Sequence, residues 1–405
     1  MQYRRFGRLD WQVSALGFGC MRLPTAGRTH GPDILETEAT AMFRHAIDQG
    51  VNYFDTAYPY HGGESEKFLG RALAGGYRSK VRIATKFPTW LAQSAADFDR
   101  YFNEQLERLQ TACIDFYLLH GLQAGSWARL KGLGYLPWAE KQRAAGRIGR
   151  LGFSFHDHRQ ALEQIVDDYD DWTVCMIQYN FMDFETQATR AGLDFAASKG
   201  LTIAVMEPLA GGRLARPPAP VQALWDSAPV RRTPAEWALH WVWSQPEVSV
   251  VLSGMSSMRQ VEENLAAAEA SRPGLLKPGE LNLVARVREE YKRACPVPCT
   301  ECGYCLPCPQ GVNIPRNFRL YNDGAMYTDA ETARGWYKAW LEEKERAEVC
   351  TGCGECESKC PQRIAIAQWM PRLRAVLADG RPYPAGTEKS RPEAVRAGKA
   401  GEREG

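Results

Sequence analysis

The chain has 405 residues, of which 44% are hydrophobic and 24% are charged, and its formal net charge is +2. The two signs of charge are balanced, which argues against a dedicated nucleic-acid surface, because such a surface shows as a basic stripe. No apolar run approaches the ~20 residues that a membrane-spanning helix needs, so we expect no membrane association. The opening segment MQYRRFGRLDW has no apolar stretch behind its basic residues, and we therefore expect a cytoplasmic protein.

Residues 1 to 270 alternate short apolar runs with amphipathic stretches. Eight apolar runs have the continuity of buried parallel strands, namely residues 14–20, 51–55, 81–86, 114–120, 150–155, 173–178, 201–207 and 248–254. The stretches between them, such as 38–50 and 95–110, have helical periodicity. Eight strand–helix units predict a (β/α)8 TIM barrel of the α/β class, whose active site lies at the C-terminal ends of the strands.

Polar or ionisable residues stand at the ends of these predicted strands: Asp55, Lys86, His120, Ser154, Gln178, Glu207 and Ser253. Such positions favour chemistry over packing. The segments FDTAYPY (54–60), ATK (84–86) and LLH (118–120) resemble the catalytic segments of the aldo-keto reductase superfamily. The resemblance covers roughly residues 1 to 270, and the whole chain is similar to the branch of that superfamily with a C-terminal ferredoxin-like domain.

The resemblance implies a catalytic tetrad for carbonyl reduction, in which Tyr60 is the general acid, Lys86 and Asp55 tune it, and His120 orients the carbonyl. A free tyrosine has a pKa near ~10, so proton donation at neutral pH needs a nearby cation to stabilise the phenolate. A buried lysine needs a counter-ion, which Asp55 would supply. Donors aimed at the carbonyl oxygen stabilise the negative charge that hydride attack builds there.

Each tetrad residue also has a structural alternative when it is taken singly. His120 could be a hydrogen-bonded core histidine, and Asp55 could cap the following helix. Lys86 could pair with a surface acid, and Tyr60 could simply pack. The joint occurrence of all four at positions that match one family favours the catalytic interpretation.

The resemblance also implies contacts to a nicotinamide ring. Ser154 and Gln178 would hydrogen-bond the carboxamide. Met206 occupies the position at which the family often has an aromatic residue stacked on the ring, and a thioether can also lie against a ring.

Residues 253–264 resemble the segment that binds the adenosine phosphate, and Glu263 and Asn264 match its glutamate and asparagine. Ser253 begins the segment and is a further candidate contact, and Arg259 is its basic residue, one place away from a basic position of the family. Family members often carry basic residues where this chain has Gly254 and Gln260. Discrimination between NADP and NAD depends on charge opposite the 2′-phosphate, so the sequence leaves both cofactors open. The structural alternative is an ordinary amphipathic barrel helix with a solvated arginine.

Two loops at the expected catalytic face carry aromatic residues. One contains Trp90, and the other, residues 121–138, contains Trp127, Tyr135 and Trp138. Loops at this face set specificity, so the sequence predicts that these side chains shape a pocket for an apolar or aromatic carbonyl compound. Alternatively, the same aromatic residues dock the C-terminal region.

Eight of the twelve cysteines form two C-terminal runs, each followed by proline. A run of three cysteines at two-residue intervals binds three corners of a cubane cluster, and the cysteine before the proline ligates the other cluster of a pair. The pattern therefore predicts two 4Fe-4S clusters, the first held by Cys299, Cys302, Cys305 and Cys360, and the second by Cys350, Cys353, Cys356 and Cys308. The first run departs from the bacterial spacing, because two residues rather than three precede its last cysteine.

The alternatives for these cysteines are zinc sites and disulfides. Paired C-x2-C units can bind zinc, but zinc does not require four cysteines per run with a Cys-Pro ending. A reducing cytoplasm disfavours disulfides. The other cysteines, Cys20, Cys113, Cys175 and Cys295, are expected to be small buried residues, although Cys295 lies only four residues before the first run.

The predicted organisation is a barrel over 1–275, a linker and helix over 276–294, a small α-helical dicluster domain over 295–378 and a disordered tail over 379–405. The tail is rich in Gly, Arg, Glu, Pro and Lys. Between the cysteine runs, residues 329–347 predict one or two helices whose inward aromatic side chains shield the clusters, namely Trp336, Tyr337 and Trp340.

Together these features predict an oxidoreductase that reduces an aldehyde or ketone with NAD(P)H, or oxidises the alcohol, and holds two clusters. The clusters could be structural, could pass electrons between an external carrier and the barrel, or could belong to a non-catalytic, nucleotide-sensing subunit, which the intact tetrad disfavours. Nicotinamide moves two electrons as hydride, whereas a cluster ordinarily moves one. Coupling therefore requires a flavin, an electron-transfer partner protein that holds one, or radical chemistry on the substrate.

Overall fold

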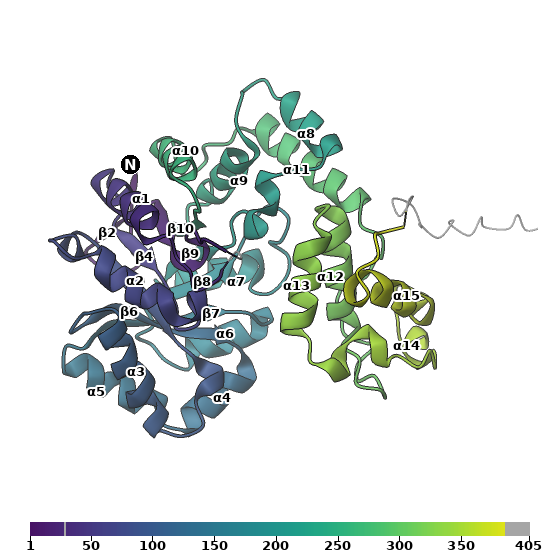
Figure 1. Ribbon diagram of the computed structural model, residues 1–405, viewed down its shortest axis with the longest axis horizontal. Coiled ribbons are helices and arrows are strands. Elements are labelled where there is room, and N and C mark those ends of the chain that lie inside the picture. The colour runs from purple at the N-terminus through teal and green to yellow at the C-terminus, as the bar shows by residue number, and fades with distance from the viewer. Residues whose placement is uncertain (28–29, 385–405) are drawn as a thin grey trace, which may run out of the picture. The chain divides into compact units, whose positions relative to one another are not determined.

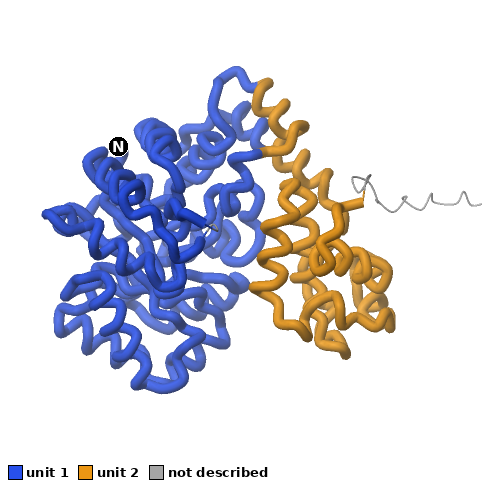
Figure 2. The backbone as a smooth tube through the Cα atoms, in the orientation of Figure 1, with its two compact units in different colours: residues 1–216, 228–284 blue, residues 217–227, 285–405 orange. Residues whose placement is uncertain are grey.

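The computed structural model describes residues 1–27 and 30–384. These residues form two compact units, one made of 1–216 with 228–284, the other of 217–227 with the chain from 285 onward (Figure 2). Most of the tail that the sequence predicts to be disordered, residues 385–405, lies outside the described residues. Within the described part, no helix is long and apolar enough to cross a bilayer.

The first unit is a closed barrel of parallel strands, as the sequence predicts (Figure 1). Its strands are β3 (Leu16–Gly19), β4 (Tyr53–Asp55), β5 (Arg82–Phe87), β6 (Ile114–Leu122), β7 (Ile148–Phe155), β8 (Val174–Gln178), β9 (Thr202–Met206) and β10 (Val248–Gly254). Each strand pairs with the next, and β10 closes the ring on β3. The TIM barrel is therefore confirmed.

A hairpin precedes the barrel and contributes to its interior. It consists of β1 (Tyr3–Arg5) and β2 (Gln12–Ser14), which pair antiparallel. Phe6, in the turn between them, is fully buried, with its ring centroid 4.6 Å from that of Phe116 on β6. The barrel interior is thus a packed core, and the C-terminal strand ends carry the polar residues.

Helices pack around the strands as an outer layer whose buried side is apolar. They are α1 (Glu36–Asp48), α2 (Glu64–Ala72), α3 (Ala96–Arg108), α4 (Ala124–Gly132), α5 (Tyr135–Ala144), α6 (Arg159–Asp167), α7 (Thr189–Ser198), α9 (Pro234–Trp243) and α10 (Met258–Glu269). Side-chain caps begin several of them. The Thr233 hydroxyl accepts from the backbone N–H of Glu236 at 3.1 Å, which satisfies one of the free donors at the start of α9.

The aromatic side chains after His120 do not form a substrate pocket, so that prediction is wrong. Residues 121–138 complete β6 and form α4 and the start of α5, and their aromatic side chains pack in the outer helical layer. Trp127 lies against Trp172, and its Nε1 donates to Asp168 at 2.7 Å. Tyr135 is fully buried. These side chains face the helix–strand interface because each fills the apolar stripe of an amphipathic helix.

The second unit is a small helical assembly. It contains α8 (Ala219–Asp226), the latter part of α11 (Pro278–Arg293), α12 (Ile314–Met326), α13 (Ala330–Trp340), α14 (Glu355–Ser358) and α15 (Ile366–Leu373), the last followed by a π-helical turn (Arg374–Ala378). Phe318, Tyr321 and Leu373 are at the centre of its apolar core. The cysteine runs lie mostly in the loops between these helices, and Cys356 lies within α14.

The inward orientation expected for the aromatic residues of α13 is correct only in part. Tyr337 is buried and Trp336 is half-buried, but Trp340 is 46% exposed. Trp340 is the last residue of the helix and stacks on Trp336, with 4.6 Å between the ring centroids. Residues four apart share one helix face, so the Trp340 ring covers Trp336, which itself packs against the unit's core.

Candidate active site and cluster-binding region

The four residues of the predicted tetrad meet at the C-terminal ends of three neighbouring strands. Asp55 ends β4, Lys86 lies on β5 and His120 on β6, while Tyr60 begins a short 3-10 turn (Tyr60–Gly63) after β4. Lys86 Nζ donates to Asp55 Oδ1 at 2.6 Å, to the main-chain oxygen of Thr56 at 2.7 Å and to Tyr60 Oη at 3.3 Å. Asp55 and Lys86 are both buried.

The electrostatics of this group favour an ammonium beside a protonated phenol. Burial by itself lowers the pKa of Lys86, but Asp55 and Tyr60 act against it and the net shift is upward. Burial raises the pKa of Tyr60, and the Lys86 charge lowers it in part. The phenol therefore keeps its proton at neutral pH, and the neighbouring ammonium stabilises the phenolate that remains once the proton is given away.

His120 faces the tyrosine edge-on, with 6.0 Å between the ring centroids. Burial, together with the charges of Lys86 and His156, holds the pKa of His120 well below its usual value. Its Nδ1 is buried and has no hydrogen-bond partner among the described residues. The neutral ring therefore has one N–H donor available for an oxygen in the site.

Trp90 lies beside His120, with 5.1 Å between the ring centroids, and is 47% exposed. Of the aromatic residues that the sequence places in the two loops, this is the one whose contact with the tetrad the structure shows. It provides an open apolar surface next to the reacting groups.

The predicted nicotinamide residues lie at the next strand ends. The buried Ser154 hydroxyl accepts from the backbone N–H of Gly121 at 2.8 Å. Gln178 ends β8 directly opposite Met206, which ends β9 and packs at the edge of the barrel interior. The three residues thus lie on consecutive strands, and contact with a carboxamide remains a prediction.

Sequence analysis did not identify the polar partners of Gln178. Its Nε2 donates to Asp183 at 2.6 Å, and its Oε1 accepts from Gln187 at 3.1 Å. Gln187 Oε1 in turn lies 3.2 Å from His156 Nδ1. The loop after β8 brings these side chains together, and it carries no motif from which the contacts could be predicted.

The predicted adenosine-phosphate residues surround the start of α10. Asn264 Nδ2 donates to Ser253 Oγ at 3.0 Å inside the protein, and the Ser257 side chain caps the helix. Arg259 is on the outside, where its Nε donates to Glu263 at 2.7 Å and its side chain is 84% exposed. Asn264 and Ser253 thus contact each other within the local fold, whereas Arg259 is paired with Glu263 at the surface.

A second arginine, which sequence analysis missed, lies beside Gly254. A Cβ at that glycine would lie only 3.0 to 3.1 Å from Cβ, Cγ and Cδ of Arg22. The aliphatic part of the Arg22 side chain therefore occupies the space that a side chain at position 254 would fill. Arg22 belongs to the turn after β3 (Cys20–Arg22). Position 22 is far from 254 in the sequence, so only the barrel closure of β10 on β3 brings the two together.

Four cysteines from both runs line one cavity in the second unit: Cys299, Cys302, Cys305 and Cys360. These are the ligands that the spacing predicts for the first cluster. Apolar side chains complete the lining, among them Ile314, Phe318 and Ile366. Four thiols within an apolar shell fit a 4Fe-4S cluster, because such a shell limits solvent access to the iron and sulfide.

The second predicted ligand set lies partly at the surface of the unit. Cys308, Cys350 and Cys356 are half-buried and pack against its apolar core. Cys353 is exposed in the same run. Cys295 is not part of the cavity lining, and its Sγ lies 3.4 Å from the main-chain oxygen of Val297. Within the described ranges, no three Cys, His, Asp or Glu side chains are arranged to hold a single metal ion.

The barrel and the cysteine cavity together define an oxidoreductase barrel followed by an iron–sulfur module. The aldo/keto reductase family model matches residues 15–272, and the 4Fe-4S dicluster domain model matches residues 298–365. The chain belongs to the aldo/keto reductase family and carries a C-terminal 4Fe-4S dicluster domain.

Individual relatives resemble the barrel part of the chain. L-galactose dehydrogenase of Arabidopsis thaliana is 31% identical over 289 residues, which are 66% of this chain and 88% of that protein. The holo form of an aldo-keto reductase from Bacillus halodurans is 28% identical with a TM-score of 0.58, covering 71% of this chain and 96% of its own. An aldo-keto reductase from Klebsiella pneumoniae in complex with NADPH is 25% identical with a TM-score of 0.56, covering 71% and 95%.

Proposed function

We propose that the barrel reduces an aldehyde or ketone with NADPH or NADH, or oxidises the corresponding alcohol, with Tyr60 as the acid. The carrying observation is the buried chain of contacts from Asp55 through Lys86 to Tyr60. A lysine ammonium next to a phenol is the arrangement that proton donation to an alkoxide requires. The Klebsiella pneumoniae relative in complex with NADPH supports the choice of cofactor.

A nicotinamide held by Ser154, Gln178 and Met206 would supply the hydride in this reaction. The tyrosine hydroxyl then gives its proton to the oxygen on which negative charge develops. Lys86, held in place by Asp55 and by the Thr56 carbonyl, stabilises the phenolate left behind. The neutral imidazole of His120 donates its N–H to the same oxygen, which fixes the carbonyl between two donors.

The substrate class follows from the exposed Trp90 next to His120. A flat apolar surface beside two donors suits a carbonyl compound with an apolar or aromatic face. The relative named L-galactose dehydrogenase makes aldoses a second class to include in a substrate panel, because the C–H face of a sugar can also stack on an indole ring.

In the second unit we propose that Cys299, Cys302, Cys305 and Cys360 hold one cluster and that Cys350, Cys353, Cys356 and Cys308 hold the other. The cavity that the first four cysteines line supports this division. In this division the last cysteine of each run, Cys308 or Cys360, belongs to the cluster of the other run, so the ligands of the two clusters interleave along the chain.

The test of the barrel's function is Tyr60→Phe, which deletes the proton donor and keeps the ring. We expect carbonyl turnover to fall at least ~100-fold, as loss of a general acid does, while nucleotide affinity changes little. Steady-state kinetics on a panel of aldehydes and ketones, with nucleotide binding followed by fluorescence, measures both. Wild-type turnover in this variant would mean that Tyr60 is a packing residue.

A further inference from the structure

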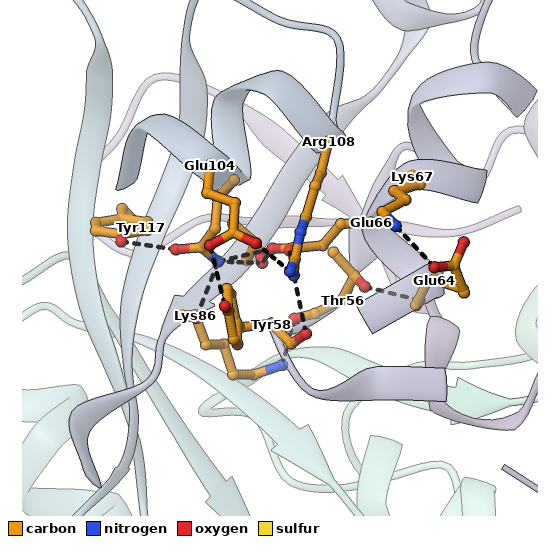
Figure 3. A network of polar contacts seen from close by, with 12 residues as sticks. Thr56, Tyr58, Glu64, Glu66, Lys67, Lys86, Glu104, Arg108 and Tyr117 are labelled. Carbon is orange, nitrogen blue, oxygen red and sulfur yellow. Dashed lines mark hydrogen bonds and ion pairs between the residues drawn. The ribbon is translucent and has the colours of Figure 1, made fainter. Parts of the chain in front are cut away.

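Behind the tetrad, away from the proposed substrate, a carboxylate is buried in a network of donors (Figure 3). Glu66, on the first turn of α2, is fully buried. Its Oε1 accepts from Thr85 Oγ1 at 2.6 Å and from Gln105 Nε2 at 2.7 Å, and its Oε2 accepts from Arg108 Nη1 at 3.3 Å. Burial raises the pKa of Glu66, whereas these donors stabilise its ionised form. All three contacts to Glu66 come from hydrogen-bond donors, as an ionised carboxylate requires, because its oxygens can only accept.

Each donor to Glu66 is connected directly to a segment that carries a tetrad residue. Thr85 precedes Lys86 on β5, and Gln105 Nε2 also donates to the main-chain oxygen of Lys86 at 3.1 Å. Arg108 Nη1 also donates to the main-chain oxygen of Tyr58 at 3.3 Å. Tyr58 lies in the segment between Asp55 and Tyr60. One carboxylate therefore ties together the two stretches of chain that bring the lysine and the tyrosine to each other.

A second set of contacts connects the network to the ammonium group of Lys86. Lys86 Nζ donates to the Thr56 carbonyl, and the Thr56 hydroxyl lies 2.9 Å from that of Ser65, the residue before Glu66. Gly70 lets α2 approach α3 closely, because a Cβ there would lie 2.8 Å from the main-chain oxygen of Arg108. The helix pair α2 and α3 thus forms one support for both ends of the Lys86–Tyr60 contact.

Stability alone is a weak reason for such a network. A buried ion pair loses the hydration of both charges, and well-packed apolar side chains of similar volume are often as stabilising or more so. Misplacement of a catalytic group by ~1 Å, in contrast, can reduce a rate about 100-fold. A polar network that touches both sides of one catalytic contact therefore acts most effectively through geometry.

We propose that Glu66 and Arg108 are positioning residues that maintain the 3.3 Å separation between Lys86 Nζ and Tyr60 Oη. The proposal rests on the proposed function, in which that contact stabilises the phenolate. Neither residue touches the substrate; the two act through Thr85, Gln105 and the main chain around Tyr58. Arg108 also pairs with Glu104, whose Oε2 accepts from the Tyr58 hydroxyl at 3.0 Å, so the support extends to the outer face of α3.

The pH profile of kcat distinguishes positioning from simple packing. The titratable or charged groups around Tyr60 are Lys86, Asp55, Cys20 and His120. Activity needs the protonated phenol, so the rate falls as pH rises through the pKa of the phenol. The adjacent ammonium lowers that pKa. If the ammonium moves away, the pKa rises, the alkaline limb moves to higher pH, and kcat falls because the phenolate is less stabilised.

The experiment is Glu66→Gln in the full chain, which keeps the size of the side chain and removes its charge. We expect kcat to fall about 10-fold, a partial loss of general acid catalysis. KM for the carbonyl and nucleotide affinity should each stay within about 2-fold, because no binding contact is removed. The alkaline limb of kcat should move up by about half a pH unit or more, as expected for a weaker neighbouring charge.

The matched control is Asp115→Asn. Asp115, on β6, accepts from Arg78 Nη2 at 2.7 Å and from the backbone N–H of Ile83 at 2.9 Å, so it is a charged link to β5 at the end of that strand opposite Lys86. This variant should lose stability without a change in the pH profile. If Glu66→Gln loses stability but keeps the wild-type kcat and profile, the network is architectural and the proposal is wrong.

A milder variant covers the case in which Glu66→Gln does not fold. Thr85→Val is nearly isosteric and removes one donor to Glu66. It should shift the alkaline limb in the same direction by a smaller amount, and an unchanged profile would overturn the proposal. Tyr60→Phe measured beside these variants separates the two hypotheses, because wild-type turnover in that variant contradicts the proposed function rather than the positioning role.

Discussion

At the scale of single residues, the charge states of Lys86 and His120 follow from burial and from neighbouring titratable groups. Lys86 stays charged because Asp55 and Tyr60 outweigh the effect of burial on its pKa. His120 stays neutral because burial and the Lys86 charge act in the same direction on its pKa. The barrel thus places a cation, a neutral acid and a neutral donor around one point, and each role depends on the one ion pair.

The lowered pKa of His120 has a consequence for the pH dependence of activity. A ring whose pKa lies well below 6.5 remains neutral throughout the neutral range and becomes charged only in more acidic solution. We therefore expect kcat/KM for carbonyl reduction to show no loss attributable to His120 as pH falls from about 8 to about 6. An acidic limb near pH 6.5 that is absent from His120→Gln would show that the histidine titrates normally.

Cofactor preference is also decided by individual residues. Gly254 and Gln260 lack charge, and Arg259 is paired with Glu263 at the surface. A single exposed ion pair contributes only about 1 kcal/mol, so NADH should bind no more than ~10-fold more weakly than NADPH. Equilibrium titration of both nucleotides measures the ratio. A preference for NADPH above about a hundredfold would contradict this expectation and would make Arg22, beside Gly254, the residue to replace.

At the scale of elements, the two cysteine runs lie mainly in loops between short helices, and Cys356 lies within the short helix α14. The last cysteine of the second run completes the cavity formed by the first run. Buried helix residues such as Phe318 and Ile366 form the apolar part of the same lining. The cavity therefore depends on packing of the helices, and the helices depend on the loops that join them.

Iron content tests this dependence. After anaerobic purification we expect about eight irons per chain, four for each cluster. Cys302→Ala should remove about half of the iron and lower the thermal stability of the second unit, because metal binding contributes folding free energy. The control is Cys295→Ala, a cysteine outside the cavity lining, which should retain all the iron. Stoichiometric zinc without a brown chromophore would contradict the cluster assignment.

At the scale of the whole molecule, an aldo/keto reductase barrel and a 4Fe-4S dicluster domain share one chain. One metal site would suffice to stabilise a unit of this size, yet the chain carries ligands for two. In the proposed division Cys308 and Cys360 each ligate the cluster of the other run, which favours clusters close enough to exchange electrons with each other. We infer from this arrangement that the clusters are redox-active and not only structural.

The corresponding prediction is that the clusters change redox state when the barrel turns over. Substrate and NAD(P)H are added under anaerobic conditions, with and without flavin or ferredoxin, and cluster reduction is followed by paramagnetic resonance. If the clusters are reduced only when flavin or ferredoxin is added, that carrier is the group that passes the two electrons of a hydride to the clusters one at a time. Tyr60→Phe provides the control, since it blocks turnover without touching the clusters. If the clusters never change redox state while the barrel turns over normally, their role is structural.

Local patterns were sufficient for the barrel strands and for the 4Fe-4S dicluster domain. Buried parallel strands are continuous apolar runs, and cluster ligands follow a fixed local spacing, so both can be read from neighbouring residues. The aromatic side chains of residues 121–138 show the limit of this approach. Trp127 and Tyr135 suit a pocket and a helix interface equally well by residue type, and only their packing in the outer helical layer distinguishes the two.

The sequence by itself determined the eight-stranded barrel, the strand ends at which the tetrad stands and the two cysteine runs. Only the tertiary structure decided which side chains support the site. Glu66 and Gln105 are 39 residues apart, and Arg22 lies next to Gly254 only because the barrel closes. Partners so distant in the chain leave no periodicity or spacing by which they can be recognised, since their contact depends on how two helices and a ring of strands pack together.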